Sequence, residues 1–240
     1  MTNLEIESLN NELSKLSLEE LLIHCNQLFD SSIVCASSLG PEDQVLTHYI
    51  QHNAKDIPIF VLDTLRLHQA TYDVMTKTMN QYDFEYTIVL PKAEKIKPMV
   101  KKYGKNLFYQ SLELRELCCF NRKVEPLIRA LSGKKAWITG LRRAQSITRA
   151  TMPMVEWDST HQLIKINPLL HWSKDDVWSI INTNNIPVNK LHDDGFPSIG
   201  CAPCTRAIQP GEDERAGRWW WESPEQKECG LHKSILKKGK

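Results

Sequence analysis

Short runs of apolar residues alternate along the chain with longer stretches in which apolar residues recur every three or four positions. The short runs, which have the length of buried strands, are 32–36, 57–62, 86–90, 136–140 and 161–166. The stretches with helical periodicity are 69–82, 92–103, 122–131 and 173–184, and a further helix begins at Pro41. Strands that alternate with helices indicate βαβ units. We therefore expect an α/β fold with a mostly parallel sheet and helices on both faces.

The first thirty residues predict helical structure. Ser17 and Glu20 stand at the spacing of a capping box, in which each satisfies a backbone N–H of the other residue. The apolar residues that follow share one helical face: Leu18, Leu21, Leu22, Cys25 and Leu28. We expect this face to be buried, with Cys25 as a small apolar residue within it.

The periodic pattern weakens after Gly140. Between 186 and 228 the sequence is rich in Pro, Gly, Trp and charged residues. Three consecutive tryptophans at 219–221 are too aromatic for a solvated, disordered segment. This region is therefore predicted to be a functional loop region.

Composition and charge exclude some classes of protein. In 240 residues, Lys and Arg number 30 and Asp and Glu 29, which gives a net charge of +1 and argues against a dedicated nucleic-acid binder. No apolar run approaches the roughly 18 residues that a membrane span needs. Residues 1–10 contain two glutamates and no basic residue, unlike a secretory signal. We expect a cytoplasmic protein with no membrane partner.

Three predicted strand ends carry polar or basic groups, and ligands of parallel α/β sheets bind at such ends. The groups after these strands are Ser37, Ser38, Gly40, Glu42 and Asp43, then Asp63, Thr64 and Arg66, and finally Arg142 and Arg143. Turn chemistry alone explains any one of them. Together they favour a nucleotide-type anion site, and the absence of a G-x-x-x-x-G-K-[ST] motif excludes a Walker-type NTPase.

Seven cysteines are unusual in a reducing compartment unless they bind metal or act in catalysis. Cys118, Cys119, Cys201 and Cys204 offer four thiolates, the number that a tetrahedral zinc site or an iron–sulfur cluster requires. Adjacent cysteines suit a [4Fe–4S] cluster somewhat better than zinc, and a redox C-x-x-C beside two buried thiols is the plainer alternative.

Cys229 is the remaining thiol and lies beside Gly230 near the end of the chain. Arg215, Arg218 and His232 are basic residues that would lower the pKa of a thiol placed among them. Cys229 is thus a candidate nucleophile. An incidental exposed thiol on a solvated charged face is the alternative.

These residues lie in segments that resemble a known family. The segments are SSLGPEDQVL, LDTLRLHQATY, CCFNRKVEPL, WITGLRRAQS, IPVNKLHDDGFPSIGCAPCTR, GEDERAGRWWWE and KECGLH. Across residues 32–232 the chain resembles the assimilatory adenylyl-sulfate (APS) reductases, the iron–sulfur branch of the APS/PAPS reductase family, with an adenine nucleotide alpha-hydrolase-like fold.

The resemblance implies a reaction and the residues that carry it out. Cys118, Cys119, Cys201 and Cys204 match the ligands of a [4Fe–4S] cluster. Cys229 matches the nucleophile, which takes the sulfonate from APS, releases AMP and passes sulfite on when thioredoxin or a glutaredoxin-like reductant attacks. The positions that match substrate-binding residues are Ser37, Ser38, Gly40, Glu42, Asp43, Asp63, Thr64, Arg66, Arg122, Lys123, Arg142, Arg143, Arg149, Arg215, Arg218 and His232. Whether the protein forms a homo-oligomer is left open.

The resemblance also implies a division of the chain. We expect a helical segment at 1–30 and a nucleotide-binding α/β domain at 31–200. Residues 201–240 would hold the cluster loop, a lid rich in Arg and Trp and the catalytic tail, all within one structural domain.

Three positions depart from the family pattern: Leu65 stands where many relatives have Gly, and Leu141 and Ala144 replace polar residues. Three other functions are weighed against APS reduction. PAPS reduction would need further basic groups for the 3′-phosphate, and an ATP-dependent thiolation or adenylating enzyme with zinc would need an SGGxDS-type loop. A metal-binding module without enzymatic activity would leave Cys229 and the strand-end arginines without a role.

Overall fold

The computed structural model describes residues 2–145 and 151–223. Arg149, Cys229 and His232, three of the predicted site residues, lie outside the described residues.

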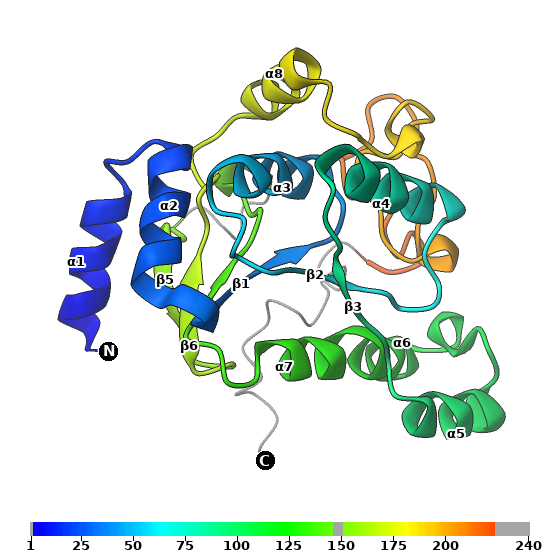
Figure 1. Cartoon of the computed structure of the whole chain (residues 1–240). Coiled ribbons are helices and arrows are strands. Elements are labelled where there is room, and N and C mark those ends of the chain that lie inside the picture. The colour runs from blue at the N-terminus through cyan, green and yellow to red at the C-terminus, as the bar shows by residue number, and fades with distance from the viewer. Residues whose placement is uncertain (1, 146–150, 224–240) are drawn as a thin grey trace. The chain divides into compact units, whose positions relative to one another are not determined.

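The centre of the fold is a six-stranded sheet with the strand order β3-β2-β1-β4-β6-β5 (Figure 1). The strands are β1 (Ile33–Ser37), β2 (Ile59–Leu62), β3 (Thr87–Val89), β4 (Ala136–Ile138), β5 (Val155–Asp158) and β6 (Leu163–Ile166). β1 runs parallel to β2 and β4, and β4 runs parallel to β6, whereas β5 is antiparallel to β6. The predicted α/β class with a mostly parallel sheet is confirmed.

The helices agree with the sequence pattern at most positions. They are α1 (Asn3–Leu13), α2 (Leu18–Phe29), α3 (Pro41–Asn53), α4 (Gln69–Tyr82), α5 (Ala93–Tyr103), α6 (Leu112–Cys119), α7 (Glu125–Leu131) and α8 (Lys174–Asn184). The predicted capping box at Ser17 is present, and Ser173 caps α8 in the same way. Within the described parts of the chain, no helix is long and apolar enough to cross a membrane.

One expectation for α2 is wrong. Leu21, Leu22 and Cys25 are buried as predicted, but Leu28 is 47% exposed, and the neighbouring Phe29 is buried in its place. Leu28 lies at the margin of the apolar stripe, and a helical step of four residues from Cys25 leads to Phe29. The larger aromatic side chain occupies the buried position and leaves Leu28 in solvent.

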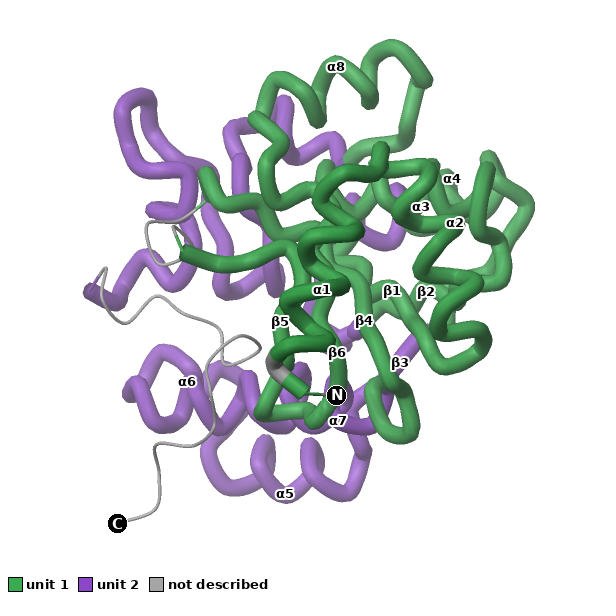
Figure 2. The backbone as a smooth tube through the Cα atoms, turned by 90° about the vertical axis from the view of Figure 1, so that its left-hand side faces the viewer, with its two compact units in different colours: residues 1–61, 75–87, 131–188 green, residues 62–74, 88–130, 189–240 purple. Residues whose placement is uncertain are grey.

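The chain divides into two compact units (Figure 2). Unit 1 comprises residues 1–61, 75–87 and 131–188, and unit 2 comprises residues 62–74, 88–130 and 189–240. The expected division of the chain into residues 1–30, 31–200 and 201–240 stays a prediction.

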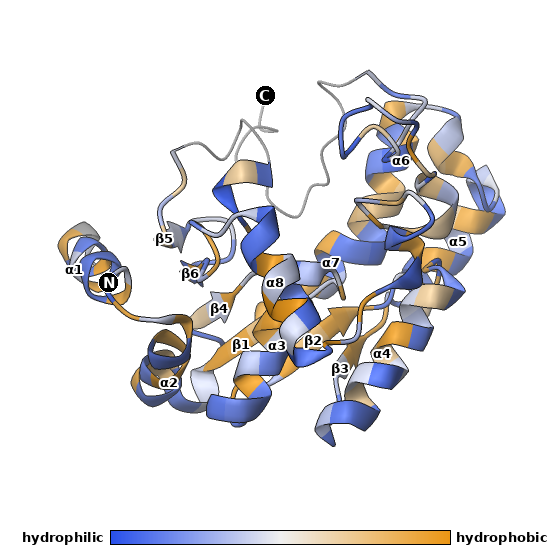
Figure 3. Cartoon of the chain, turned by 90° about the horizontal axis from the view of Figure 1, so that it is seen from above, coloured by the Kyte–Doolittle hydropathy of each residue, from blue (hydrophilic) through white to orange (hydrophobic). Residues whose placement is uncertain are grey.

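Unit 1 contains most of the sheet, and its core follows from the apolar runs. Ile33, Val34 and Cys35 of β1 are buried, as are all three residues of β4. α2 and α3 pack on β1, and α8 packs on α3. Figure 3 shows β1 mostly in the hydrophobic colour, while the outer turns of α2 carry hydrophilic residues. Burial of these strands removes apolar surface from water and stabilises the unit.

Two leucines adopt the left-handed backbone conformation that glycine tolerates best. Leu39 has φ +62° and Leu65 has φ +58°. Leu39 is 2% exposed, so the burial of its side chain offsets the strain, whereas Leu65 is 53% exposed and gains little from burial.

We expect Leu65→Gly to raise the free energy of unfolding by up to about 1 kcal/mol. A leucine in this conformation costs about 1–2 kcal/mol, and the greater freedom of glycine in the unfolded chain removes part of that gain. Leu39→Gly is the matched control and should lower the free energy of unfolding by about 2 kcal/mol or more, because it also removes a buried side chain. Urea denaturation of both variants measures the difference; a loss of stability in Leu65→Gly would contradict the argument.

Candidate active site

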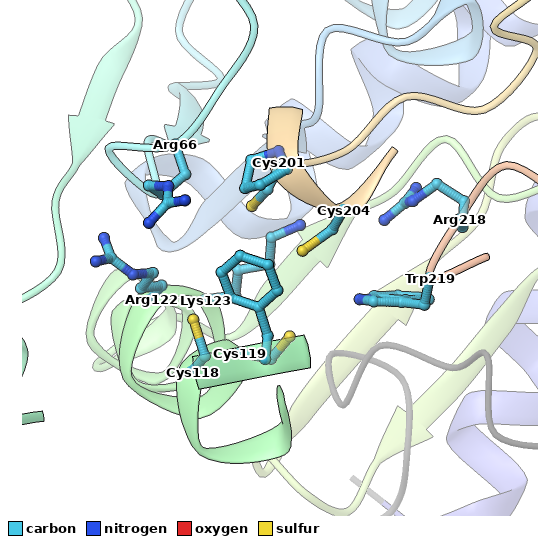
Figure 4. Close-up of a pocket in the computed structure, with 11 residues that line it drawn as sticks. Arg66, Cys118, Cys119, Arg122, Lys123, Cys201, Cys204, Arg218 and Trp219 are labelled. Atoms are coloured by element: carbon cyan, nitrogen blue, oxygen red, sulfur yellow. The ribbon is translucent and has the colours of Figure 1, made fainter. Parts of the chain in front are cut away.

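Four thiols line one pocket of unit 2. Cys118 and Cys119 end α6. On a facing segment, Cys201 precedes a short 3-10 turn and Cys204 is its last residue (Figure 4). The empty space of the pocket, part of which is open solvent, has a volume of about 410 Å³. The structure thus brings together the four cysteines that the sequence analysis grouped.

The two adjacent cysteines stand directly before an irregular turn. Ser111 caps α6, and after Cys119 the residues Phe120–Val124 form a π-helix that leads into α7. Side chains of successive helical residues point about 100° apart, so a tandem pair rarely faces one site. Here both thiols line the same pocket, at a π-helical segment of the kind that is frequent at functional sites.

Burial and mutual repulsion disfavour thiolates in this pocket. Burial, together with negative charge on Cys201 and Cys118, raises the pKa of Cys204 to about 12. Burial also raises the pKa of Cys118, although the Arg122 guanidinium opposes the shift. Four thiolates at these positions therefore need a positively charged group among them to be stable.

No three His, Cys, Asp or Glu side chains in residues 2–145 and 151–223 are grouped so that they could hold a metal ion. A single zinc would need sulfurs about 3.8 Å apart, given its bond length of about 2.3 Å and tetrahedral geometry. The cysteine sulfurs around a cubane lie farther apart than those around zinc, because each one binds a separate iron corner. Four thiols around one pocket match the number of ligands and the soft sulfur donors that a [4Fe–4S] cluster requires.

Four cationic side chains line the same pocket as the thiols: Arg66, Arg122, Lys123 and Arg218. Arg122 donates a hydrogen bond of 2.7 Å to the Thr64 carbonyl oxygen, and its buried Nε has no hydrogen-bond partner among the described residues. Arg66 donates to the carbonyl oxygen of Lys105 and the side chain of Asn106. The pocket therefore presents positive charge, which suits an anion.

Arg218 is held tightly beside the second cysteine pair. It is 8% exposed, donates to Ser198 Oγ and to the Ile199 carbonyl oxygen, and its guanidinium lies 4.8 Å from the Trp219 ring centroid. A Cβ atom on Gly200 would lie 2.5 Å from Arg218 Nη2. Only glycine fits at position 200 while the arginine stays in place.

The turn after β2 supports the cysteine pocket from within unit 2. Thr64 Oγ1 lies 3.2 Å from Cys201 Sγ, at hydrogen-bond distance for a sulfur atom. Asp63 accepts hydrogen bonds from the Leu65 N–H and from the Tyr72 hydroxyl. Asp63 and Thr64 therefore fix the shape of this turn.

The predicted substrate residues of unit 1 form their own cluster. Asp43 accepts hydrogen bonds of 2.6 Å from both the N–H and the hydroxyl of Ser38. Arg142 Nε donates to Glu42 Oε1 at 2.8 Å, an ion pair with both side chains largely buried. A Cβ atom on Gly140 would overlap Asp43 Oδ1, so the loop after β1 lies directly against the end of β4.

Four further predicted residues make contacts that are less decisive for a site. Ser37 accepts a hydrogen bond from the Leu39 N–H, and Gly40 precedes α3 as its N-cap. Arg143 donates to the Met152 carbonyl oxygen. Arg215 is half-buried and is not among the residues that line the cysteine pocket.

Asp43 gives the fold a dependence on pH. Burial raises the pKa of Asp43 to about 6, although hydrogen bonds from Ser38 and Gly140 oppose the shift. An unfolded aspartate titrates near pH 4, so the stability that the protonated carboxyl contributes is full below about pH 4 and is lost as pH rises through about 6.

Between about pH 5 and about pH 7.5, we expect the free energy of unfolding of the wild type to fall by about 1 kcal/mol relative to that of Asp43→Asn. The asparagine does not titrate, and all other groups are common to both proteins. Denaturant unfolding of the two proteins over this range measures the difference. A difference that stays constant with pH would contradict the raised pKa of Asp43.

Sequence reasoning missed several residues of the site. Phe108, Pro203 and Trp219 line the cysteine pocket, and Arg115 is buried on α6. Trp219 belongs to the run of tryptophans that predicted a functional loop region, although it was not named as a site residue. Pro203 stands within the C-x-x-C, so proximity in sequence could have drawn attention to it. Phe108 carries no comparable signal, because its place depends on how the chain folds back on α6.

The fold and the thiol pocket agree with the family that is found when the chain is compared with known protein families. The chain belongs to the phosphoadenosine phosphosulfate reductase domain family, whose model matches residues 32–207.

Curated relatives that carry the name adenosine 5′-phosphosulfate reductase are similar over most of their length. The protein of Allochromatium vinosum is 50% identical over 217 residues, which cover 90% of this chain and 84% of the relative. That of Burkholderia cepacia is 48% identical over 215 residues, with 90% and 86% covered.

Solved structures agree on the fold. A phosphoadenylyl-sulfate (PAPS) reductase from Candida auris, solved as a phosphate complex, is 29% identical, with a TM-score of 0.74 over 87% of this chain and 98% of that one. The FMN adenylyltransferase of Candida glabrata is 16% identical with a TM-score of 0.54, over 87% and 68% of the two chains, and shows the fold alone.

Proposed function

We propose that this protein reduces adenosine 5′-phosphosulfate to sulfite and AMP in sulfate assimilation, with Cys229 as the nucleophile. The observation that carries the proposal is the pocket of four thiols lined by four cations, in a chain about 50% identical to proteins named for this reaction. A thiol pocket alone would suit a metal-binding module, and family membership alone would not distinguish APS from PAPS.

The first step transfers the sulfonate. The Cys229 thiolate attacks the sulfur of the phosphosulfate, an S–S bond forms, and the bond from that sulfur to the bridging oxygen breaks. The electron pair of the broken bond leaves on the phosphate oxygen of AMP. Cationic side chains lower the energy of this developing charge, and we assign that role to Arg142, Arg143, Arg149, Arg215 and Arg218, with Arg122 or Lys123.

The second step needs a dithiol. One thiolate of a thioredoxin or glutaredoxin-like protein attacks the Cys229 sulfur and releases sulfite, which leaves with the S–S bonding pair. The second thiolate of the donor then displaces Cys229 and closes a disulfide, so the donor is oxidised by two electrons. The need for a reduced dithiol supports the cytoplasm as the location of the reaction.

We further propose that Cys118, Cys119, Cys201 and Cys204 bind a [4Fe–4S] cluster. All four line one pocket, and the repulsion among their thiolates calls for a cationic group. When bound, the cluster would join α6 to the 201–204 segment and add the field of an iron–sulfur group to the pocket. We assign the binding of the nucleotide to the strand-end residues named above and to His232.

Mass spectrometry of the reaction without reductant tests the proposal. Wild-type protein incubated with APS should gain the mass of one sulfonate on the peptide that contains Cys229, with one AMP released per chain modified. The same mass on another cysteine, or AMP release without any adduct, would contradict the assignment.

PAPS reduction is the second candidate, because the Candida auris structure is named for that substrate. Discrimination between the two nucleotides is a ratio of kcat/KM values. We expect the ratio to favour APS by at least about tenfold, and competition of both nucleotides in one reaction mixture measures it directly. A ratio in favour of PAPS would replace the first proposal by the second.

A further inference from the structure

Arg115 is a buried arginine that the proposed reaction does not use. It lies on α6, one helical turn before Cys119, and its side chain is only 1% exposed. A guanidinium is rarely buried to this extent unless other groups in the fold satisfy its charge and its donors. The contacts of Arg115 therefore indicate the role of this buried cation.

The guanidinium has an anionic partner far along the chain. Arg115 Nε donates to Glu222 Oε1 at 3.0 Å, and Nη2 donates to Oε2 at 2.8 Å, with the Glu222 side chain only 6% exposed. The parallel pair of bonds fixes the position and the orientation of the carboxylate. The two residues are 107 positions apart in the sequence.

The same guanidinium also contacts a proposed cluster ligand. Arg115 hydrogen-bonds the sulfur of Cys119. It lies 5.0 Å from the centroid of the Trp219 ring, on which Arg218 also packs. One side chain thus joins a cysteine of the pocket to the segment that contains Trp219 and Glu222.

The position of Glu222 in the sequence gives this contact a consequence for Cys229. The two positions are seven steps apart along the chain, and a fully extended chain spans at most about 3.6 Å per residue. Cys229 therefore lies within roughly 25 Å of Glu222 in any conformation of the intervening chain. Fixing Glu222 defines the centre of the volume that the nucleophile can reach.

Stability alone is a poor explanation of the pair. Buried ion pairs are often no more stabilising than apolar residues of similar volume, because both charges lose their hydration. They do define a particular geometry, and here the geometry joins the end of α6 to Glu222.

We infer that Arg115 is a positioning residue: it ties Glu222, and with it the start of the segment that carries Cys229, to the end of α6 that presents Cys118 and Cys119. The inference rests on the proposed role of Cys229 in the reaction. It assigns a role to two residues, Arg115 and Glu222, that do not need to touch the substrate.

Glu222→Gln tests the tie with a minimal change of shape. At saturating APS and without reductant, the rate constant for sulfonate transfer to Cys229 should fall at least tenfold. The APS dissociation constant should stay within about twofold, and the iron content should be unchanged. Sulfonation at the wild-type rate in iron-loaded Glu222→Gln would overturn the inference.

The chain offers a matched control in Arg206 and Glu212. This pair is also bidentate, with contacts of 2.9 and 2.8 Å, but both side chains are about one-third exposed. Glu212→Gln should leave the sulfonation rate within about twofold of the wild type. A loss equal to that of Glu222→Gln would show a general effect of charge in this region and would overturn the inference.

A second variant tests the contact with Cys119 through spectroscopy instead of activity. Arg115→Gln removes the cation and its hydrogen bond to the sulfur, so the iron–sulfur stretching frequencies of the loaded protein should rise in resonance Raman spectra. Glu222→Gln keeps that bond and should leave them unchanged. Unshifted frequencies in Arg115→Gln would overturn the inference. If Arg115→Gln binds no iron, the rate of Cys229 sulfonation in Glu222→Gln still tests the inference.

The design separates this inference from the proposed function. If wild-type protein forms no adduct on Cys229, the proposed function fails before any variant is compared. If the wild type forms the adduct and Glu222→Gln forms it equally fast, only the role of Arg115 fails.

Discussion

Replacing Cys229 with Ser should abolish sulfite release from APS, while iron content and APS binding stay at the wild-type level. A hydroxyl at this position is not ionised near neutral pH and is a far weaker nucleophile toward sulfur than a thiolate. Sulfite production should therefore fall below the detection limit. The measurement combines a sulfite assay with thioredoxin present, an equilibrium binding assay for APS and a count of iron per chain.

Cys25→Ala is the control for loss of a thiol. Cys25 is fully buried on α2, where burial raises the pKa of its thiol to about 12 and leaves it unreactive. Sulfite release by this variant should stay within about twofold of the wild type. Sulfite production by Cys229→Ser in the same assay would contradict the proposed mechanism.

Cys204→Ser should lose the iron–sulfur cluster. Cys204 is buried in an apolar group of unit 2 that includes Leu107, Phe108 and Trp219. Serine offers a harder oxygen ligand that is mostly protonated, which suits iron–sulfur chemistry poorly. Substitution of residues that only hydrogen-bond the metal ligands already weakens metal binding about 10- to 100-fold. Loss of a ligand itself should therefore weaken cluster binding at least about a hundredfold.

Iron and sulfide counts and the visible absorption of anaerobically purified protein measure this loss. Cys35→Ala provides the comparison, because Cys35 is also buried but lies in β1, and it should keep its full iron content. Zinc in the wild type, with no iron–sulfur absorption in protein kept from air, would contradict the cluster assignment.

The sequence predicted most of the sheet because its strands are apolar on both faces and stand out as runs. β5 was not predicted, because its four residues include Glu156 and Asp158 and resemble a polar turn. Its partner β6 supplies the pairing that makes it a strand. α6 was also missed, since its residues 112–119 mix charged and apolar side chains without a clear stripe, and packing against the rest of unit 2 decides its conformation.

For the site, sequence reasoning could group the four thiols, which line one pocket, because cysteines are few and chemically distinctive. It could not identify the pairing of Glu42 with Arg142, which lie 100 positions apart and carry charges common on any surface. The pairing of Arg115 with Glu222 was hidden for the same reason. The placement of Cys229, His232 and Arg149 stays a prediction.

The close approach of Arg218 to Gly200 limits how this protein can change during evolution. Because even one methyl group at position 200 would displace the guanidinium, any larger residue there becomes acceptable only after Arg218 has changed. The order of substitution is therefore constrained, and the intermediate with alanine at 200 and arginine at 218 is disfavoured. Relatives should keep both residues or replace both, so the two positions are inherited as a pair although 17 residues stand between them.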